Sequence, residues 1–130
     1  MARVTGIGGI FFKCSDPEGL KEWYTRHLGI PSDKYGHLFA FHEADHPGNR
    51  GLLQWSPFPA DTTYLAPSTK DFMINYRVDD LEALVAQIRD AGLAFLDEIE
   101  TYPYGKFIHL LDPEGNKIEL WEPLDPGFEV

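Results

Sequence analysis

The chain has 130 residues, of which 43% are hydrophobic and 25% are charged, a balance typical of a single compact globular domain. Its 21 acidic and 11 basic residues give a formal charge of −10, so the overall field repels nucleic acid and an anionic membrane surface alike. No apolar run approaches the roughly 18 residues that a membrane span needs. The single cysteine, Cys14, excludes an intramolecular disulfide, and we expect a cytoplasmic protein.

The first part of the chain predicts a strand followed by a capped helix. Apolar residues alternate over 10–14, which is typical of a half-buried strand. Asp16 is a good N-cap because a carboxylate accepts hydrogen bonds from the free amides of the first turn, and Pro17 suits the first helical position. Gly29 is expected to end the helix. The apolar stripe predicted to face the sheet consists of Leu20, Trp23, Tyr24 and Leu28.

Further strands are predicted after this helix, at His37–His42 and Leu52–Ser56 and, on a weaker pattern, near Pro31–Lys34. The segment Pro57–Lys70 carries three prolines and is interpreted as a linker that borders a site. Three tyrosines lie in loops that close over a cleft or pack beside it, and these are Tyr64, Tyr102 and Tyr104.

The second part of the chain repeats the first. When Asp80 is placed under Asp16, residues 74–78 fall under 10–14, and each copy then reaches a glycine, Gly29 or Gly92. The second helical stripe consists of Leu81, Leu84, Val85 and Ile88. Strands are predicted at Ala94–Thr101, Lys106–Leu111 and Lys117–Trp121. Two such units, over about residues 4–58 and 70–122, predict a pseudo-symmetric α+β domain.

Strand alternation separates two faces of the predicted sheet. On the last hairpin a purely aliphatic face is expected beneath the helices, formed by Ile108, Leu110, Ile118 and Leu120. The opposite face mixes aromatic and polar side chains, which is the composition of a ligand cleft. The residues expected to contact a ligand there are Phe11, Lys13, Gln54, Asn75, Arg77, Phe107 and Trp121.

The last hairpin also predicts a pair of titratable groups. If the turn 112–116 closes symmetrically about Glu114, His109 lies opposite Glu119 with their Cβ atoms about 4.5–5.5 Å apart. The carboxylate would raise the pKa of the imidazole, and the two groups could act as acid and base. The same spacing fits an exposed cross-strand ion pair that performs no chemistry. Both alternatives stay open.

Two segments, together with the duplication, resemble the vicinal oxygen chelate superfamily: Trp23-Tyr24-Thr25-Arg26-His27-Leu28-Gly29 and Asp112-Pro113-Glu114-Gly115-Asn116-Lys117-Ile118-Glu119-Leu120. This superfamily includes glyoxalase I, bleomycin-resistance proteins, fosfomycin-resistance enzymes and extradiol dioxygenases. The resemblance covers nearly the whole chain. It implies one domain over residues 1–130, built from two tandem βαβββ modules that form one curved mixed sheet with a cleft. It also implies a homodimer that binds a small molecule.

The resemblance further implies where a metal would bind. Metal-dependent members take ligands from four cleft positions, which correspond here to Gly9, Gln54, Met73 and Glu119. Glycine cannot ligate, an amide is a weak ligand, and a thioether suits Mn, Mg or Zn poorly. Since a lasting site needs about three good protein ligands, we expect no metal centre. Any divalent ion would have to be held by Glu119, His109 and Gln54.

Two functions from different classes follow. The first is a metal-free binding protein of the bleomycin-resistance kind, which holds a small, partly aromatic molecule in the cleft. The second is an enzyme of the lyase, isomerase or dioxygenase type, with Glu119 as metal ligand or base and His109 as its acid–base partner. The lack of three strong ligands favours the first over a metal-dependent enzyme, and it does not weigh against a metal-free acid–base enzyme.

Overall fold

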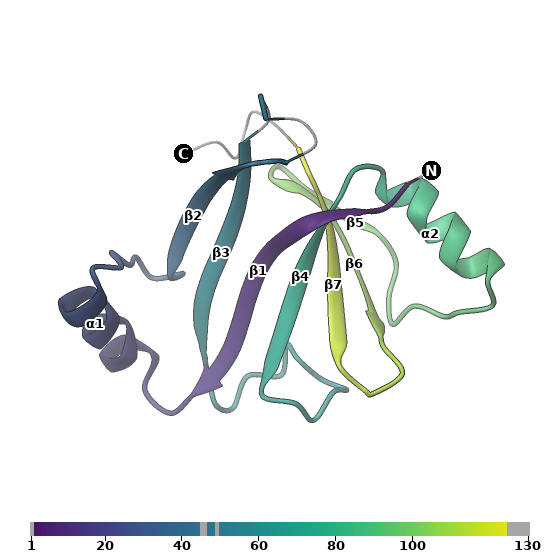
Figure 1. The fold of residues 1–130 in the computed structure, drawn as a ribbon. Coiled ribbons are helices and arrows are strands. Elements are labelled where there is room, and N and C mark those ends of the chain that lie inside the picture. The colour runs from purple at the N-terminus through teal and green to yellow at the C-terminus, as the bar shows by residue number, and fades with distance from the viewer. Residues whose placement is uncertain (1, 45–46, 49, 125–130) are drawn as a thin grey trace.

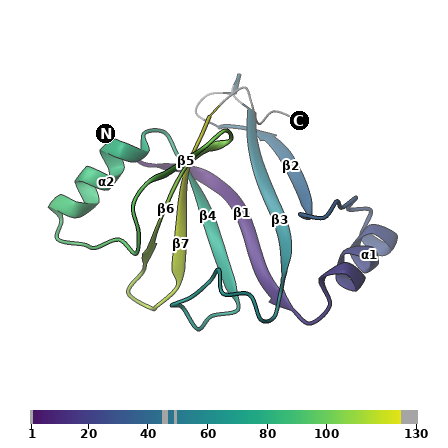
Figure 2. The ribbon, with the colours of Figure 1, turned by 180° about the vertical axis from the view of Figure 1, so that it is seen from behind.

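The computed structural model describes residues 2–44, 47–48 and 50–124. The elements follow in the order β1 (Val4–Cys14), α1 (Pro17–Leu28), β2 (His37–His42), β3 (Arg50–Pro59), β4 (Phe72–Val78), α2 (Leu81–Asp90), β5 (Glu100–Tyr102), β6 (Gly105–Leu111) and β7 (Lys117–Pro123). The strands form one curved seven-stranded sheet in the order β2-β3-β1-β4-β7-β6-β5, which is not closed into a barrel (Figure 1). The view from behind shows α1 beside the β2 end and α2 beside the β6 end (Figure 2).

The sheet is mixed, and β1 lies at its centre. This strand runs parallel to β3 and antiparallel to β4, and β4 in turn runs parallel to β7. The pairing of β1 with β4 therefore joins the first strand of each unit and makes the two units one sheet. The predicted α+β architecture, with a helix after the first strand of each unit, is confirmed.

Both helices begin and end where local sequence signals predict. The Oδ1 atoms of Asp16 and Asp80 each accept a hydrogen bond from the backbone N–H three residues later, at 3.0 and 3.1 Å. Past the helix ends, Gly29 and Gly92 have φ values of 71° and 87°, a left-handed conformation that glycine adopts without steric cost. Neither helix of the described residues is long and apolar enough to cross a membrane.

Two predicted strands are wrong in extent. Pro31–Lys34 forms no strand and contributes only an isolated bridge to Gly36. The strand expected at Ala94–Thr101 is reduced to β5. The reason lies in Asp97, whose carboxylate accepts the backbone N–H of His109 at 2.8 Å. A side chain thus occupies the place that the carbonyl of a paired strand would take.

The main apolar core lies between α2 and the last hairpin. Its buried members come from β4, α2, β6 and β7, and they are Val78, Leu81, Val85, Ile108, Leu110 and Leu120. Burying an aliphatic side chain of this size contributes about 1.5–3 kcal/mol relative to exposure. The aliphatic face predicted for the hairpin is therefore confirmed, and it anchors the second unit.

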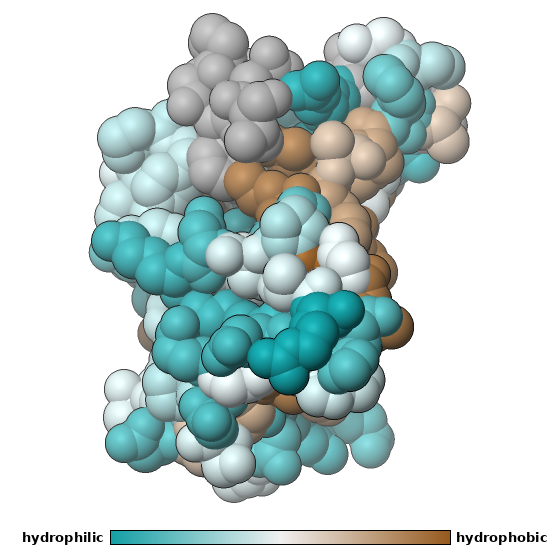
Figure 3. Space-filling model, turned by 90° about the vertical axis from the view of Figure 1, so that its left-hand side faces the viewer, coloured by the Kyte–Doolittle hydropathy of each residue, from teal (hydrophilic) through white to brown (hydrophobic). Residues whose placement is uncertain are grey.

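Helix α1 packs less closely than its apolar stripe predicts. The side chains of Trp23 and Leu28 are 50% and 59% exposed, and the residue that is buried on this helix is Lys21. The ring of Tyr24 contacts that of Trp55, with 4.9 Å between centroids. Seen from this end, most of the surface is hydrophilic, with an apolar area in its upper part (Figure 3). The expectation that the whole stripe faces the sheet is wrong for Trp23 and Leu28.

Two leucines test this unequal packing. Leu81→Ala removes a fully buried side chain (0% exposed). It should lower the free energy of unfolding by about 2–5 kcal/mol because a cavity remains. Leu28→Ala, at a position 59% exposed on α1, should change it by no more than about 0.5 kcal/mol. Urea unfolding of both variants gives the comparison, and equal losses would contradict the packing described for α1 and α2.

Candidate functional site

A row of positions crosses the sheet perpendicular to its strands. The Cα register pairs Gln54 with Gly9, Gly9 with Asn75, Asn75 with Glu119, and Glu119 with His109. Directly paired residues project to the same face of a sheet. We call these five residues the polar row. Its last pair is the His109–Glu119 pairing predicted from the hairpin, which is confirmed.

The polar row lies along a cleft of about 1250 Å³. Side chains of the row that line this cleft are Gln54, Asn75 and Glu119, and the loop between α1 and β2 forms its outer wall. Aromatic side chains line it on both sides of the row, and these include Phe11, Phe58, Tyr104, Phe107 and Trp121. Apolar walls with a few placed polar groups are typical of a small-molecule site.

Two residues predicted to contact a ligand lie elsewhere. Lys13 is half-buried in β1, and neither it nor Arg77 belongs to the described residues that line the cleft. The Arg77 side chain is 8% exposed. Its guanidinium lies 5.3 Å from the ring centre of Trp121 and 5.9 Å from that of Phe41. Arg77 therefore supports an aromatic wall through cation–π contacts.

Adjacent glycines in β1 make room for the cleft side chains. A Cβ on Gly8 would lie 2.4 Å from Asn75 Oδ1 and 2.8 Å from the Trp121 ring, and a Cβ on Gly9 would lie 2.7 Å from the Phe11 ring. Neither position accepts a side chain unless these groups move. The space at Gly9, where the resemblance implies a metal-ligand position, is thus occupied by the Phe11 ring.

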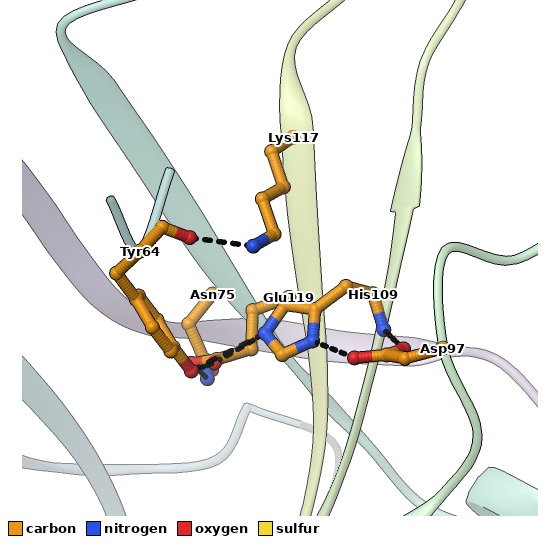
Figure 4. A network of polar contacts seen from close by, with 6 residues as sticks. All are labelled: Tyr64, Asn75, Asp97, His109, Lys117 and Glu119. Atoms are coloured by element: carbon orange, nitrogen blue, oxygen red, sulfur yellow. Dashed lines mark hydrogen bonds and ion pairs between the residues drawn. The ribbon is translucent and has the colours of Figure 1, made fainter. Parts of the chain in front are cut away.

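Glu119 is 3% exposed, and donors from three residues hold its carboxylate (Figure 4). Asn75 Nδ2 donates to Oε1 at 2.7 Å. His109 Nε2 lies 2.8 Å from Oε2, and the Tyr64 hydroxyl donates to the same oxygen. A buried carboxylate without partners would carry a large desolvation cost. These contacts therefore hold Glu119 in a defined position at the cleft.

His109 lies between two carboxylates. Its Nδ1 is 2.7 Å from Asp97 Oδ2, while its Nε2 faces Glu119. Burial alone lowers the pKa of His109, but the hydrogen bonds with Glu119 and Asp97 outweigh it and raise this pKa above its ordinary value. The imidazolium form can donate to both carboxylates at once. Asp97 was missed from the sequence because it belongs to no motif or periodic pattern.

Tyr64 reaches this cluster from the linker between the two units. Its ring meets that of His109 edge-on, with 5.6 Å between centroids. Burial and the charge of Glu119 raise the pKa of Tyr64, so its hydroxyl remains a proton donor. Lys117 Nζ donates to the backbone carbonyl of Tyr64, and burial lowers the pKa of Lys117 against the attraction of Asp97 and Glu119. The linker is thereby fixed to β7.

The structure corrects one of the four metal positions implied by the resemblance. Met73 pairs with Phe11, whereas Asn75 pairs with Gly9. The Met73 side chain is fully buried in a cluster with Phe11 and Leu65. The polar row therefore offers two amides, one carboxylate and one imidazole, and no thioether.

The alternative ligand set of Glu119, His109 and Gln54 does not converge on a point. His109 Nε2 is directed at Glu119, and Gln54 Nε2 donates to the Tyr35 carbonyl and to Ser56 Oγ, each at 3.0 Å. Within residues 2–44, 47–48 and 50–124, no group of three or more His, Cys, Asp or Glu side chains could hold a metal ion. The side chains present do not fit the ligand set that a divalent metal requires.

Comparison with known proteins agrees with the fold. The family model described as Glyoxalase/Bleomycin resistance protein/Dioxygenase superfamily matches residues 6–120. No curated protein matches the chain. A methylmalonyl-CoA epimerase of Streptomyces coelicolor, solved with 2-nitronate-propionyl-CoA, has 20% identity and a TM-score of 0.67, covering 93% of this chain and 99% of that one.

Two further solved structures are similar. The methylmalonyl-CoA epimerase of Mycobacterium tuberculosis has 26% identity and a TM-score of 0.60, covering 93% of this chain and 89% of that one. The Mn(II)-bound glyoxalase of Novosphingobium aromaticivorans has 21% identity and a TM-score of 0.58, covering 94% of this chain and 40% of that one.

The contacts of His109 predict that the stability of the folded chain depends on pH. Because its pKa is raised in the folded chain, the stabilisation it provides is fully present below the unfolded pKa of about 6.5 and is lost as pH rises through the folded pKa. NMR titration of the imidazole should therefore give a midpoint above about 6.5. Asp97→Asn should lower it, because one carboxylate acceptor is lost. Glu98→Gln is the matched control, since Glu98 pairs with Arg89 at 3.3 Å. Equal effects of the two variants would contradict the assignment.

Proposed function

Because the chain belongs to the glyoxalase/bleomycin resistance protein/dioxygenase superfamily, we propose that its cleft binds a small, partly aromatic molecule without a divalent metal. The observation that carries this proposal is a cleft of about 1250 Å³ with a polar row along it and aromatic walls beside it. Few, well-held polar groups between apolar walls are the usual composition of such sites.

The aromatic walls support a planar ligand. The rings of Phe11 and Phe58 stack at 5.2 Å with 11° between planes, and those of Phe107 and Trp121 lie at 5.8 Å with 5° between planes. The first pair belongs to β1 and β3 and the second to β6 and β7, so they lie on opposite sides of Asn75 in β4. An aromatic contact contributes about 0.5–1.5 kcal/mol beyond the area it buries.

The state of Glu119 supports binding without a metal. A carboxylate bound by Asn75, His109 and Tyr64 has most of its acceptor sites occupied. A metal would have to compete with these donors, and beside Glu119 the row would supply it with one imidazole and otherwise with amide oxygens, which are weak ligands. The matched relatives bind a CoA derivative or Mn(II), and at this identity their ligands are not carried over. The homodimer and the cytoplasmic location stay predictions.

A neutral aromatic probe tests the proposed binding. Titration with para-ethylphenol should shift the indole N–H signal of Trp121 in NMR spectra and leave that of Trp23, on the outer part of α1, unchanged. Phe107→Leu should weaken binding about two- to tenfold because one ring contact is lost. Trp23→Leu is the matched control and should bind the probe as the natural chain does. Shifts confined to Trp23 would contradict a ligand site in the cleft.

The metal part of the proposal needs its own measurement. Thermal unfolding of chelator-treated protein should show no rise in midpoint with Mn²⁺, Fe²⁺, Ni²⁺, Zn²⁺ or Mg²⁺, since a ligand that binds only the folded state must raise it. If one metal raises the midpoint and Glu119→Gln abolishes the rise, a metal centre exists and the metal-free proposal is wrong.

A second candidate is a metal-free acid–base enzyme, favoured by the hydrogen-bonded cluster of Glu119, His109, Asp97 and Tyr64, in which Glu119 and His109 are buried. Positioned general bases accelerate proton transfer about 10²–10⁴-fold. Three donors, however, already occupy most acceptor sites of Glu119 and weaken it as a base, and this ranks the enzyme second. Acetophenone in D₂O tests it: loss of the methyl proton signal should be accelerated by the natural chain and not by Glu119→Gln. Equal rates for both would remove this candidate.

A further inference from the structure

We infer that the ligand of this cleft presents hydrogen-bond donors, best a protonated amine beside an aromatic ring, to the acceptor atoms of the polar row. This inference rests on the proposed binding function and names the class of ligand that the cleft would take. It follows from the groups to which the polar side chains along the cleft donate their hydrogen bonds, and from the charged side chains near the polar row.

The donors of Gln54 and Ser56 are engaged within the protein. Gln54 Nε2 donates to the Tyr35 carbonyl and to Ser56 Oγ, each at 3.0 Å, and the Ser56 hydroxyl donates to the same carbonyl. Both side chains line the cleft. Since the amide nitrogen of Gln54 is engaged by the outer-wall loop, the group it leaves for a ligand is its carbonyl oxygen.

Asn75 leaves an acceptor in the same way. Its Nδ2 donates to Glu119 Oε1 at 2.7 Å, and the reverse orientation would set a carbonyl oxygen against a carboxylate. Its Oδ1 therefore faces away from Glu119 and lies beside Gly8, which also lines the cleft. Asn75 is 2% exposed, and its Oδ1 accepts no hydrogen bond from the residues that the structure describes. This acceptor lacks a donor and is closed to solvent, so a ligand donor would satisfy it only by displacing the groups packed beside Gly8.

The other nearby donors are engaged within the protein as well. The Tyr64 hydroxyl donates to Glu119, and Trp121 Nε1 donates to the Tyr104 carbonyl at 3.0 Å. The polar row therefore offers a ligand an amide oxygen from Asn75, an amide oxygen from Gln54 and the remaining acceptor capacity of the Glu119 carboxylate. A carboxylate or phosphate on the ligand would meet acceptors where it needs donors.

The carboxylates beside the row act in the same direction. Glu119 and Asp97 flank His109, and the ammonium of Lys117, which both carboxylates attract, donates to the Tyr64 carbonyl. The Coulomb attraction between a cation and a carboxylate is stronger at a site shielded from water than in bulk water, and so is the repulsion of an anion. The Phe107 ring adds cation–π attraction for an ammonium group, whereas the Trp121 ring already has the Arg77 guanidinium at 5.3 Å.

The two lysines that line the cleft do not reverse this charge. Lys21 is 5% exposed, and its Nζ lies 2.7 Å from Glu18 and donates to the carbonyls of Asp33 and Lys34 at 3.1 and 3.2 Å. Lys34 belongs to the outer wall, where its ammonium lies 5.0 Å from the ring centre of Tyr35. Neither bonds to the polar row.

Three probes with one ring test the inference. Tyramine, para-ethylphenol and para-hydroxyphenylpropionate share the phenol and differ only in carrying an ammonium, no charge or a carboxylate at neutral pH. NMR titration, read at the Trp121 indole and the Asn75 side-chain amide, gives a dissociation constant for each. Tyramine should bind about tenfold more tightly than para-ethylphenol, as one charge-assisted hydrogen bond provides. The carboxylate probe should bind most weakly.

Glu119→Gln separates charge recognition from a general loss of structure. This variant should lose the preference for the ammonium: the ratio of its dissociation constants for para-ethylphenol and tyramine should fall from about ten to about one. Glu98→Gln removes an equal charge outside the cleft and should keep the preference for tyramine. A variant that merely loosens the cleft would weaken all three probes together, and that result would count against the inference.

The outcomes distinguish the two proposals. If tyramine binds most tightly, para-ethylphenol less tightly and the carboxylate probe most weakly, both the proposed function and the inference are supported. If para-ethylphenol binds in the cleft but the ammonium gives no advantage, or the carboxylate probe binds most tightly, the inference is overturned and the proposed function stands. If none of the three shifts the Trp121 indole signal, the proposed function fails and the inference falls with it.

Discussion

A carboxylate that is 3% exposed depends on its donors, and Glu119 obtains them from three separate parts of the chain. Asn75 comes from β4, His109 from β6 and Tyr64 from the linker. Removing one partner of a buried charge costs more than the pair contributes, because the remaining charge stays buried. The position of these segments beside β7 and the chemistry of the cleft therefore depend on the same group.

The differences from the metal-binding pattern implied by the resemblance are consistent with one another. The Phe11 ring lies over Gly9, Gln54 donates to the outer-wall loop, and Asn75 donates to Glu119. A histidine at Gly9 would displace the Phe11 ring, and a second carboxylate at Asn75 would remove the amide donor of Glu119 Oε1. The row forms a coherent network of its own, and restoring a single ligand would not create a metal site.

The features that could be predicted from the sequence are those set by residues close together in the chain. The caps at Asp16 and Asp80 are local hydrogen bonds, and the His109–Glu119 pairing follows from a turn of known length. Asp97 could not be predicted, because its approach to His109 arises from tertiary packing. The β1–β4 register that brings Asn75 beside Gly9 is likewise set by residues far apart in the sequence. It includes a register shift between Ile7 and Gly9, which no pattern of residues in the sequence predicts.

The outer wall of the cleft explains why α1 packs so differently from α2. Lys21, at the buried position of α1, donates to the carbonyls of Asp33 and Lys34, and β3 side chains donate to the carbonyl of Tyr35. Three consecutive carbonyls are thus bound by side chains, which accounts for the absence of the strand predicted at 31–34. Burial of Lys21 replaces an apolar contact that α1 would otherwise make. In exchange, the loop is held in place before any ligand arrives, and a preformed wall lowers the ordering cost of binding.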